Sequence, residues 1–235
     1  MSGPAGRPKP DGLVWKAWAS GILKLVLGGV FIYVIAGRTD YWQGWVLVGV
    51  GVLSYVAALA VMWDKRDLIR ERTKPGPGVK GWDRAMVTGF RLLLGAVLVV
   101  GYLDAGRFGW SPPFPWWAYV LAYAGMIVAT VPALWAMRVN AFFSSHVRIQ
   151  HDRGHRVCTD GPYRWVRHPG YAGILLFGPL LPVALGSRWA LIPGLLCVPL
   201  LVWRTVLEDR TLHRELEGYV EYSRQVRFRL VPGVW

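Results

Sequence analysis

Two long runs without a charged side chain constrain the fold of this chain more than any other feature. Residues 42–63 and 115–137 contain no Asp, Glu, Lys or Arg. A helix needs about 20 apolar residues to cross the hydrocarbon core of a bilayer, so either run is long enough to span a membrane. The whole chain is 54% hydrophobic and only 17% charged, which is too apolar for an ordinary soluble domain of this length. The sequence therefore predicts an integral membrane protein.

Four weaker apolar segments extend this pattern, and they lie at 13–36, 85–103, 170–186 and 189–207. The last two are short, contain four prolines and are separated by only two residues, so they predict one kinked helical hairpin. The expected fold is an all-α, polytopic membrane bundle of about six transmembrane helices. We expect a disordered tail at 1–12, a four-span membrane region at 13–137 and a catalytic region at 138–235.

The basic residues report topology rather than a nucleic-acid site. If the six segments span, the segments at one membrane face hold 22 Lys and Arg residues and those at the other hold 3. Cytoplasmic loops are enriched in Lys and Arg, so both termini and the two long loops are predicted to be cytoplasmic. In a bacterium the protein would then lie in the inner membrane. The partner of the basic face is the lipid bilayer, with no nucleic acid expected.

The loop 64–84 mixes acidic and basic residues and then breaks at "KPGPG". This pattern predicts a short interfacial helix followed by a rigid turn. A solvated connector is the favoured interpretation, and a role in covering a site is the alternative. Cys158 and Cys197 are too few and too far apart for a disulfide framework. His151 and His155 lack a nearby third ligand, so no metal site is predicted.

The densest cluster of cationic and hydrogen-bonding groups is "GPYRWVRHPGYAG" at 161–173. Its two prolines interrupt a helix, so a turn must precede a helix that begins near Pro169. Free backbone N–H groups at that helix start, with Arg164, Arg167 and His168 beside them, suit a carboxylate or phosphate. The alternative is that the arginines only anchor the helix end to lipid phosphates.

The tail that follows the last apolar segment adds an acid. Glu208 lies about one turn beyond the apolar run, where a carboxylate is costly unless it is paired or used. An ion pair with Arg204, four residues earlier, is the alternative to a functional role. Gly218 is expected to end this helix, and a basic, aromatic segment then returns toward the membrane.

Together these two stretches resemble the isoprenylcysteine carboxyl methyltransferase family and its relatives, the membrane phospholipid methyltransferases. The family pattern is an Arg-His-Pro-x-Tyr at a helix start, a helical hairpin, paired acids and a Tyr-x-x-Tyr tail. The matching positions here are Arg167, His168, Pro169, Tyr171, Glu208, Asp209, Tyr219 and Tyr222. One departure is Asp209, which stands where glutamate is usual.

The resemblance implies a cytoplasm-facing site for S-adenosyl-L-methionine, built without a Rossmann domain, and a lipid-like or isoprenoid acceptor. Residues expected to bind the cofactor are Tyr163, Arg164, His168, Pro169, Tyr171 and Glu208. Residues expected to act in catalysis are Arg167, Glu208 and Arg227, and Arg227, Tyr219 and Tyr222 are expected to bind the acceptor. The cationic helix start could hold the cofactor carboxylate, while Glu208 and aromatic faces could stabilise its ammonium and sulfonium.

Methyl transfer is an in-line displacement that depends mainly on alignment in a dry site. No histidine–acid pair dedicated to deprotonation is evident in the sequence, which favours an acceptor that is already nucleophilic, such as a carboxylate.

Two other classes of protein stay open. NADPH-dependent membrane sterol reductases have a similar "RHPNY" element, but Gly170 replaces their asparagine and Ile174 stands where an acid often follows. The other class is a non-catalytic membrane binding protein whose basic loops only contact headgroups. A conducting pathway is disfavoured because the spans offer chiefly Lys24 and Arg91 as polar residues at depth.

Overall fold

The structure is a computed structural model that describes residues 12–235, so residues 1–11 of the tail expected at 1–12 lie outside the described residues, and Gly12 is the first residue of a helix. Its α-helices are α1 (Gly12–Ala36), α2 (Trp42–Met62), α3 (Arg66–Thr73), α4 (Gly81–Gly101), α5 (Trp116–Val139), α6 (Pro169–Leu185), α7 (Leu191–Glu215) and α8 (Tyr219–Gln225). Three shorter helical segments are the π-helix η1 (Tyr102–Phe108) and the 3-10 turns η2 (His151–Arg153) and η3 (Gly161–Arg164). No strand occurs within 12–235, so the predicted all-α fold class is confirmed.

Among the described residues, five helices are long and apolar enough to cross a membrane: α1, α2, α4 continued by η1, α5 and α7. The sixth apolar helix, α6, has only 17 residues. At 1.5 Å per residue, it is about 25 Å long, shorter than a typical hydrocarbon core. Many large apolar side chains on these helices are exposed, as expected for surfaces that face lipid rather than water.

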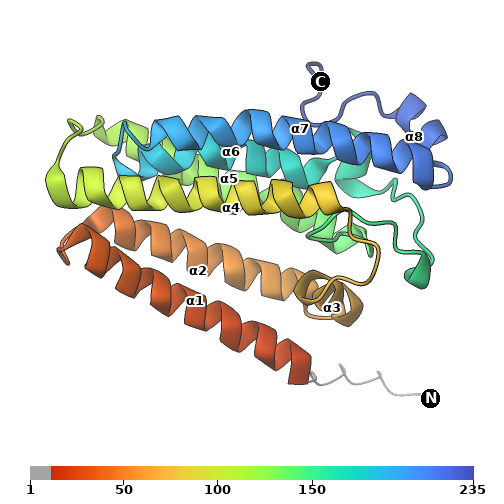
Figure 1. Cartoon of the computed structure of the whole chain (residues 1–235), viewed down its shortest axis with the longest axis horizontal. Coiled ribbons are helices and arrows are strands. Elements are labelled where there is room, and N and C mark those ends of the chain that lie inside the picture. Colours follow the sequence, from red (N-terminus) through yellow and green to blue (C-terminus); the bar gives the residue numbers. More distant parts are fainter. Residues whose placement is uncertain (1–11) are drawn as a thin grey trace, which may run out of the picture.

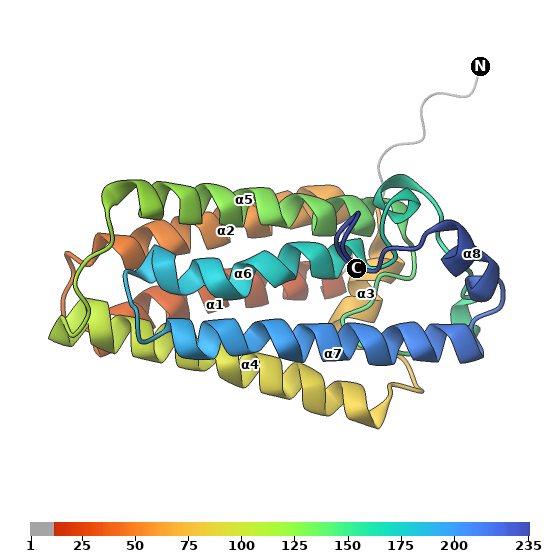
Figure 2. The same ribbon diagram turned by 90° about the horizontal axis from the view of Figure 1, so that it is seen from above.

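The helices run along one long axis, with α1 and α2 forming one side of the bundle (Figure 1). Seen from above, α6 runs between α5 and α7, and it contacts both (Figure 2). The predicted hairpin is present as α6 and α7, with prolines inside both helices. Helix α6 ends at Gly186, whose φ of +81° places it in the left-handed region that glycine adopts without strain.

Glycines allow α6 to pack closely on both neighbours. A Cβ at Gly173 would lie 2.0 Å from the backbone oxygen of Ala129 in α5. On the other side, a Cβ at Gly178 would lie 2.7 Å from the backbone oxygen of Gly194 in α7. Such small-residue contacts are typical of helix pairs in membranes, where packing rather than a hydrophobic gradient holds helices together. They fix the position of the helix start at Pro169.

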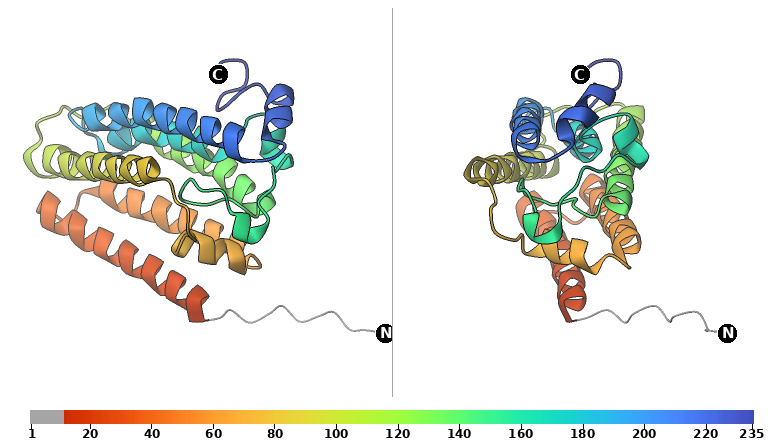
Figure 3. Two further views of the ribbon diagram at one scale, coloured as in Figure 1. Left: turned by 45° about the vertical axis from the view of Figure 1, so that its right-hand side comes forward. Right: turned by 90° about the vertical axis from the view of Figure 1, so that its right-hand side faces the viewer.

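The polar segments gather at one end of the bundle. Helix α3, the connection 140–168, α8 and the C-terminus all lie at this end, where α1 also begins (Figures 1 and 3). The short connections 37–41, 109–115 and 186–190 lie at the opposite end. The structure thus separates the long, basic loops from the short ones, as the charge pattern requires.

Candidate functional site

Asp209 of α7 is the carboxylate on which several side chains converge at the polar end of the bundle. Its carboxylate is 2% exposed and accepts hydrogen bonds from Arg167 Nη2 at 3.0 Å and Arg229 Nε at 2.9 Å. Tyr219 Oη also donates to it at 2.8 Å, and His168 Nε2 lies at 3.2 Å. A buried carboxylate is tolerated only when paired and hydrogen-bonded, and here four side chains from three segments meet that need.

The "RHP" motif is held by the C-terminal segment through the backbone. The N–H of Arg167 donates to Phe228 O and that of His168 donates to Arg229 O, both at 2.9 Å. Tyr222 Oη donates to Tyr163 O at 2.7 Å. Pro169 then begins α6, where its missing N–H costs nothing because the first turn has no intrahelical acceptor for it.

Glu208 lies beside Asp209 in the sequence but has a different hydrogen-bond partner. Its carboxylate accepts a hydrogen bond from Tyr171 Oη of α6. The Arg204 guanidinium, offered by the sequence as its ion-pair partner, instead contacts Asp83 Oδ1 of α4 at 2.8 Å. Its Cζ also lies 4.9 Å from the centroid of the Tyr171 ring. Arg204 therefore joins α4 to the Tyr171–Glu208 pair.

The connection 140–158 forms the opposite wall of the site, and two buried carboxylates hold it. Glu71 of α3 contacts Arg148 Nη2 at 2.7 Å and Nε at 2.8 Å, and both side chains are almost fully buried. Asp83 accepts the backbone N–H of Val147 at 3.0 Å and lies 2.9 Å from His146 Nδ1. Loop 64–84 is therefore more than a solvated connector, because it and the α4 start support this wall.

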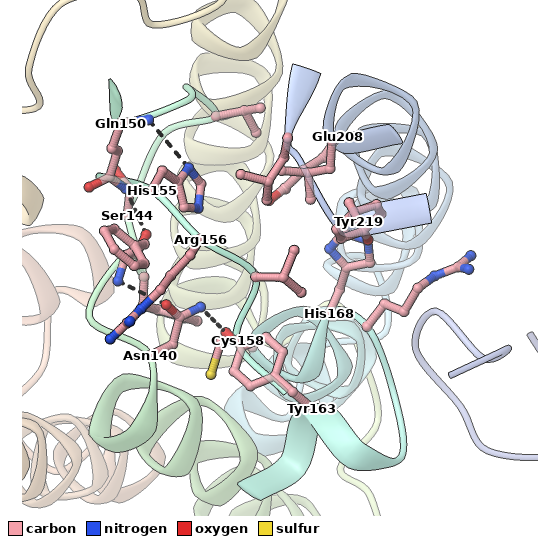
Figure 4. Close-up of a pocket in the computed structure, with 18 of the residues that line it drawn as sticks. Asn140, Ser144, Gln150, His155, Arg156, Cys158, Tyr163, His168, Glu208 and Tyr219 are labelled. Atoms are coloured by element: carbon pink, nitrogen blue, oxygen red, sulfur yellow. Dashed lines mark hydrogen bonds between the residues drawn. The ribbon is translucent and has the colours of Figure 1, made fainter. Parts of the chain in front are cut away.

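Between these elements lies a cavity of about 110 Å³ (Figure 4). Its polar lining includes Asn140, Ser144, His146, Arg148, Gln150, His155, Arg156, Arg167, His168 and Glu208. Aromatic rings complete it: Phe142, Phe143, Tyr163, Tyr171, Tyr219 and Tyr222. The cavity is thus mainly cationic and aromatic, with the Glu208 carboxylate as the acidic group of its lining.

Burial controls the protonation of several lining groups. It raises the pKa of Tyr163, Tyr219 and Tyr222 above the ordinary value, so these phenols remain hydrogen-bond donors at neutral pH. Burial, helped by the charge of Arg148, lowers the pKa of His155 to about 4. His155 is therefore neutral at pH 7, and its Nδ1 accepts the backbone N–H of Gln150 at 3.3 Å (Figure 4).

The structure brings most of the expected site residues together. Those that line the cavity are Tyr163, Arg167, His168, Pro169, Tyr171, Glu208, Tyr219 and Tyr222. Neither Arg164 nor Arg227 is among the described residues that line it. Arg164 is exposed and lies 3.8 Å from the exposed Asp160, and Arg227 is also exposed.

Sequence reasoning missed the central position of Asp209, and although it placed 138–158 in the catalytic region, it named no site residue there. A signal for the first was present, because Asp209 is an acid next to Glu208 at the end of an apolar helix. The histidine–acid pairs His146–Asp83 and His168–Asp209 were not evident either. The residues of each pair lie more than 40 positions apart, beyond any local pattern.

The donor set of the cavity fits S-adenosyl-L-methionine. Arg156 and Arg167 can receive a carboxylate, while Glu208 and the rings can receive an ammonium and a sulfonium. Among buried side-chain atoms of the described residues, Arg167 Nε lacks a hydrogen-bond partner. An unpaired buried donor is uncommon in a native structure, and a ligand oxygen would satisfy it.

Residues 120–214 match the model of the isoprenylcysteine carboxyl methyltransferase family. The match runs from α5 through the "RHP" motif and α6 to the end of α7, and includes both Glu208 and Asp209. No curated protein matches the chain. Over this region the chain is similar to the isoprenylcysteine carboxyl methyltransferase family, which indicates a membrane methyltransferase.

Proposed function

We propose that this protein transfers a methyl group from S-adenosyl-L-methionine to a lipid-like acceptor at the cytoplasmic face of the membrane. The observation that carries the proposal is the convergence of the α6 start and Glu208 of α7 on one cavity. These are the two stretches that carry the family pattern, although a helical hairpin separates them in the chain.

The cofactor would supply an electrophilic methyl carbon on a sulfonium, and the residues of this chain would hold and orient it. Arg167 and His168 stand where the carboxylate could bind, and Glu208 where it could balance a positive charge. Tyr171 fixes the Glu208 carboxylate by donating a hydrogen bond to it. A preorganised carboxylate contributes more than a mobile one, because no reorientation is needed when the ligand binds.

The position of the cavity supports an acceptor from the bilayer. At the polar end of the bundle the apolar helices α5 and α7 end and α6 begins, so a headgroup and its chain could meet a polar cofactor there. Exposed Trp135 and Trp165 pack against each other beside η3, and aromatic rings of this kind favour the membrane interface.

Ligand binding to the purified protein tests the proposal. S-adenosylhomocysteine should raise the Tm of the full chain in detergent, and NADPH should not. Glu208→Gln keeps the shape of the side chain and removes its charge, so it should weaken S-adenosylhomocysteine binding by about tenfold or more. His168→Ala should act in the same direction. Glu217→Gln is the matched control, because Glu217 is exposed and does not line the cavity.

A thermal shift with NADPH alone would instead indicate a reductase. Normal binding of S-adenosylhomocysteine by both site variants would show that the cofactor binds elsewhere. The acceptor class can be sought by incubating source membranes with the labelled cofactor and searching for lipids heavier by one methylene group.

A further inference from the structure

We infer that His146, oriented by Asp83, is the general base of this site and that the acceptor is methylated on an atom that first loses a proton. The inference rests on the proposed methyl transfer and deepens it. It separates an ammonium, thiol or hydroxyl acceptor from a carboxylate, which needs no base at neutral pH.

The Asp83 carboxylate is held in one orientation by hydrogen bonds to both of its oxygens. This carboxylate is fully buried at the start of α4, and each of its oxygens is engaged. Oδ1 accepts from Arg204 Nε at 2.8 Å, while Oδ2 accepts the Val147 N–H at 3.0 Å and lies 2.9 Å from His146 Nδ1. The carboxylate cannot turn without breaking these bonds, so it presents a fixed acceptor to the imidazole.

The Asp83 carboxylate fixes the tautomer of the His146 imidazole. An ionised carboxylate only accepts hydrogen bonds, so the proton of neutral His146 must lie on Nδ1. Nε2 then carries the lone pair. The ring lines the cavity with its side chain 18% exposed, whereas Asp83 behind it is fully covered. A histidine held at Nδ1 by a buried acid and open at Nε2 has the arrangement of a general base.

The other histidines are less suited to this role. His213 uses both ring nitrogens, on Asp209 O at 2.7 Å and Ser223 Oγ at 2.9 Å. Exposed His151 is not part of the cavity lining. His155 uses Nδ1 as an acceptor, and burial holds its pKa at about 4, too low for an effective base at neutral pH.

His168 also faces an acid, but its partner is shared with more groups. Asp209 contacts two guanidinium groups, those of Arg167 and Arg229, and accepts a hydrogen bond from Tyr219. Asp83 contacts one guanidinium group, that of Arg204. The His168 side chain is only 5% exposed, against 18% for His146, so His146 is the more accessible to an acceptor.

The His146–Asp83 pair is also joined to the expected reaction centre. Arg204 binds Asp83 and at the same time covers the ring of Tyr171, which donates to Glu208. The charged and titratable groups in or against this wall include Asp83 of α4, Arg204 and Glu208 of α7, Tyr171 of α6, Glu71 and Arg72 of α3, and Arg148, Asp152, Arg153, His155 and Arg156 of the connection. The base and the Glu208 carboxylate therefore belong to one network.

In the transfer step, His146 Nε2 takes one proton from the acceptor atom. The electron pair left on that atom forms the bond to the methyl carbon. The bond from carbon to sulfur breaks and its electron pair stays on sulfur, so the positively charged sulfonium becomes a neutral thioether. The imidazolium, stabilised by Asp83, then releases the proton to solvent.

Histidine NMR on the full chain in detergent tests the base without any acceptor. With ring-labelled histidine and His146→Gln to assign the signal, His146 should show the Nδ1–H tautomer when neutral. Asp83→Asn should weaken the preference for this tautomer, because an amide can donate to Nδ1 as well as accept from it. An Nε2–H tautomer in the wild-type protein, or a tautomer preference unchanged in Asp83→Asn, would overturn the inference.

If Asp83→Asn fails to fold, the tautomer in wild-type protein and the behaviour of His146→Gln still decide. His146→Gln should bind S-adenosylhomocysteine within about twofold of wild type while methyl transfer to an amine or thiol falls by about a hundredfold or more. His151→Gln is the matched control with no change. Added imidazole should restore transfer by His146→Ala, as expected for a lost base.

Dodecylamine, dodecanethiol and dodecanoic acid serve as acceptor probes with one chain and three head groups. Methylation of the amine or thiol that depends on His146 supports the inference, whereas methylation of the carboxylate alone overturns it. Failure of the wild-type protein to bind S-adenosylhomocysteine overturns the proposed function instead, and the NMR result remains readable. The two failures are therefore distinct.

Discussion

Arg167 and Asp209 lie 42 positions apart in the chain, and their side chains meet at 3.0 Å with less than a tenth of either exposed. This contact joins the residue before the "HP" of the motif to the acid that departs from the usual glutamate of the family pattern. The shorter aspartate still reaches Arg167, His168, Tyr219 and Arg229. Asp209 therefore holds the residues around the cavity without lining it, whereas Glu208 lines it.

Asp209→Asn should destabilise the protein more than any substitution at Glu208. Removing one partner of a buried ion pair leaves the other charge uncompensated, at a cost of about 3–5 kcal/mol. Here Arg167 and Arg229 would both lose their carboxylate. A lower Tm and a large loss of S-adenosylhomocysteine binding are expected in detergent. Asp160→Asn is the control, because its ion pair with Arg164 is exposed and worth little. Equal Tm values for the two variants would contradict the role of Asp209.

Glu71 makes part of the stability depend on pH. Burial on its own raises the pKa of Glu71, but hydrogen bonds from Arg148 and Ser144 outweigh it and leave that pKa below the ordinary value. A lowered pKa in the folded state stabilises the protein above the unfolded value, and this contribution is lost as pH falls through the folded value. The wild-type Tm should therefore fall on acidification.

Glu71→Gln should lower the Tm at about pH 7 and flatten its decline between about pH 5 and pH 3. It should also weaken S-adenosylhomocysteine binding, because Arg148 lines the cavity and would lose its anchor. Glu221→Gln is the control, since Glu221 is exposed. A pH dependence as steep in Glu71→Gln as in wild type would show that other carboxylates govern acid unfolding.

The fold could be predicted because it depends on periodic and compositional signals that are local. A run of about 20 apolar residues identifies a membrane helix wherever it occurs, and each expected span overlaps a helix of the structure, although α7 continues past the expected end at 207 to Glu215. Pro169 likewise marks the start of α6, because proline restricts the backbone of its own position. The confirmed fold class follows from signals of this kind.

The site could be predicted only where the resemblance supplied a motif. His146 and Arg148 lie in "SSHVRIQ", a stretch with no helical period, and their role depends on Asp83 and Glu71, each more than 60 positions earlier. No local rule states which of several buried acids a given arginine will meet. Arg204 illustrates the difficulty, because its near neighbour Glu208 was the expected partner and Asp83, 121 positions away, is the partner in the structure.

Close packing of α6 on α5 gives a prediction about the membrane part. In Gly173→Ala the added Cβ would meet the backbone oxygen of Ala129 at 2.0 Å, so the helices must separate. Overpacking of this kind costs about 1–3 kcal/mol, and it would also displace the α6 start. Gly95→Ala is the matched control, since a Cβ there meets nothing within 4 Å and alanine favours a helix. Thermal unfolding in detergent should show a lower Tm for Gly173→Ala only.

Two arginines near the C-terminus separate support of the site from contact with the acceptor. Arg229 Nε lies 2.9 Å from Asp209, and its Cζ lies 5.1 Å from the Trp235 ring centroid, so Arg229→Ala should lower both the Tm and cofactor affinity. Arg227 is exposed, and Arg227→Ala should change the free energy of unfolding by no more than about 0.5 kcal/mol. If Arg227 orients an acidic group of the acceptor, as its sequence position suggested, Arg227→Lys should raise the acceptor KM more than the cofactor KM, because lysine lacks the bidentate fork. If Arg227→Lys leaves both KM values unchanged, Arg227 contacts the membrane surface rather than the acceptor. If Arg227→Ala lowers the Tm more than Arg229→Ala does, the burial of these two arginines seen in the structure is contradicted.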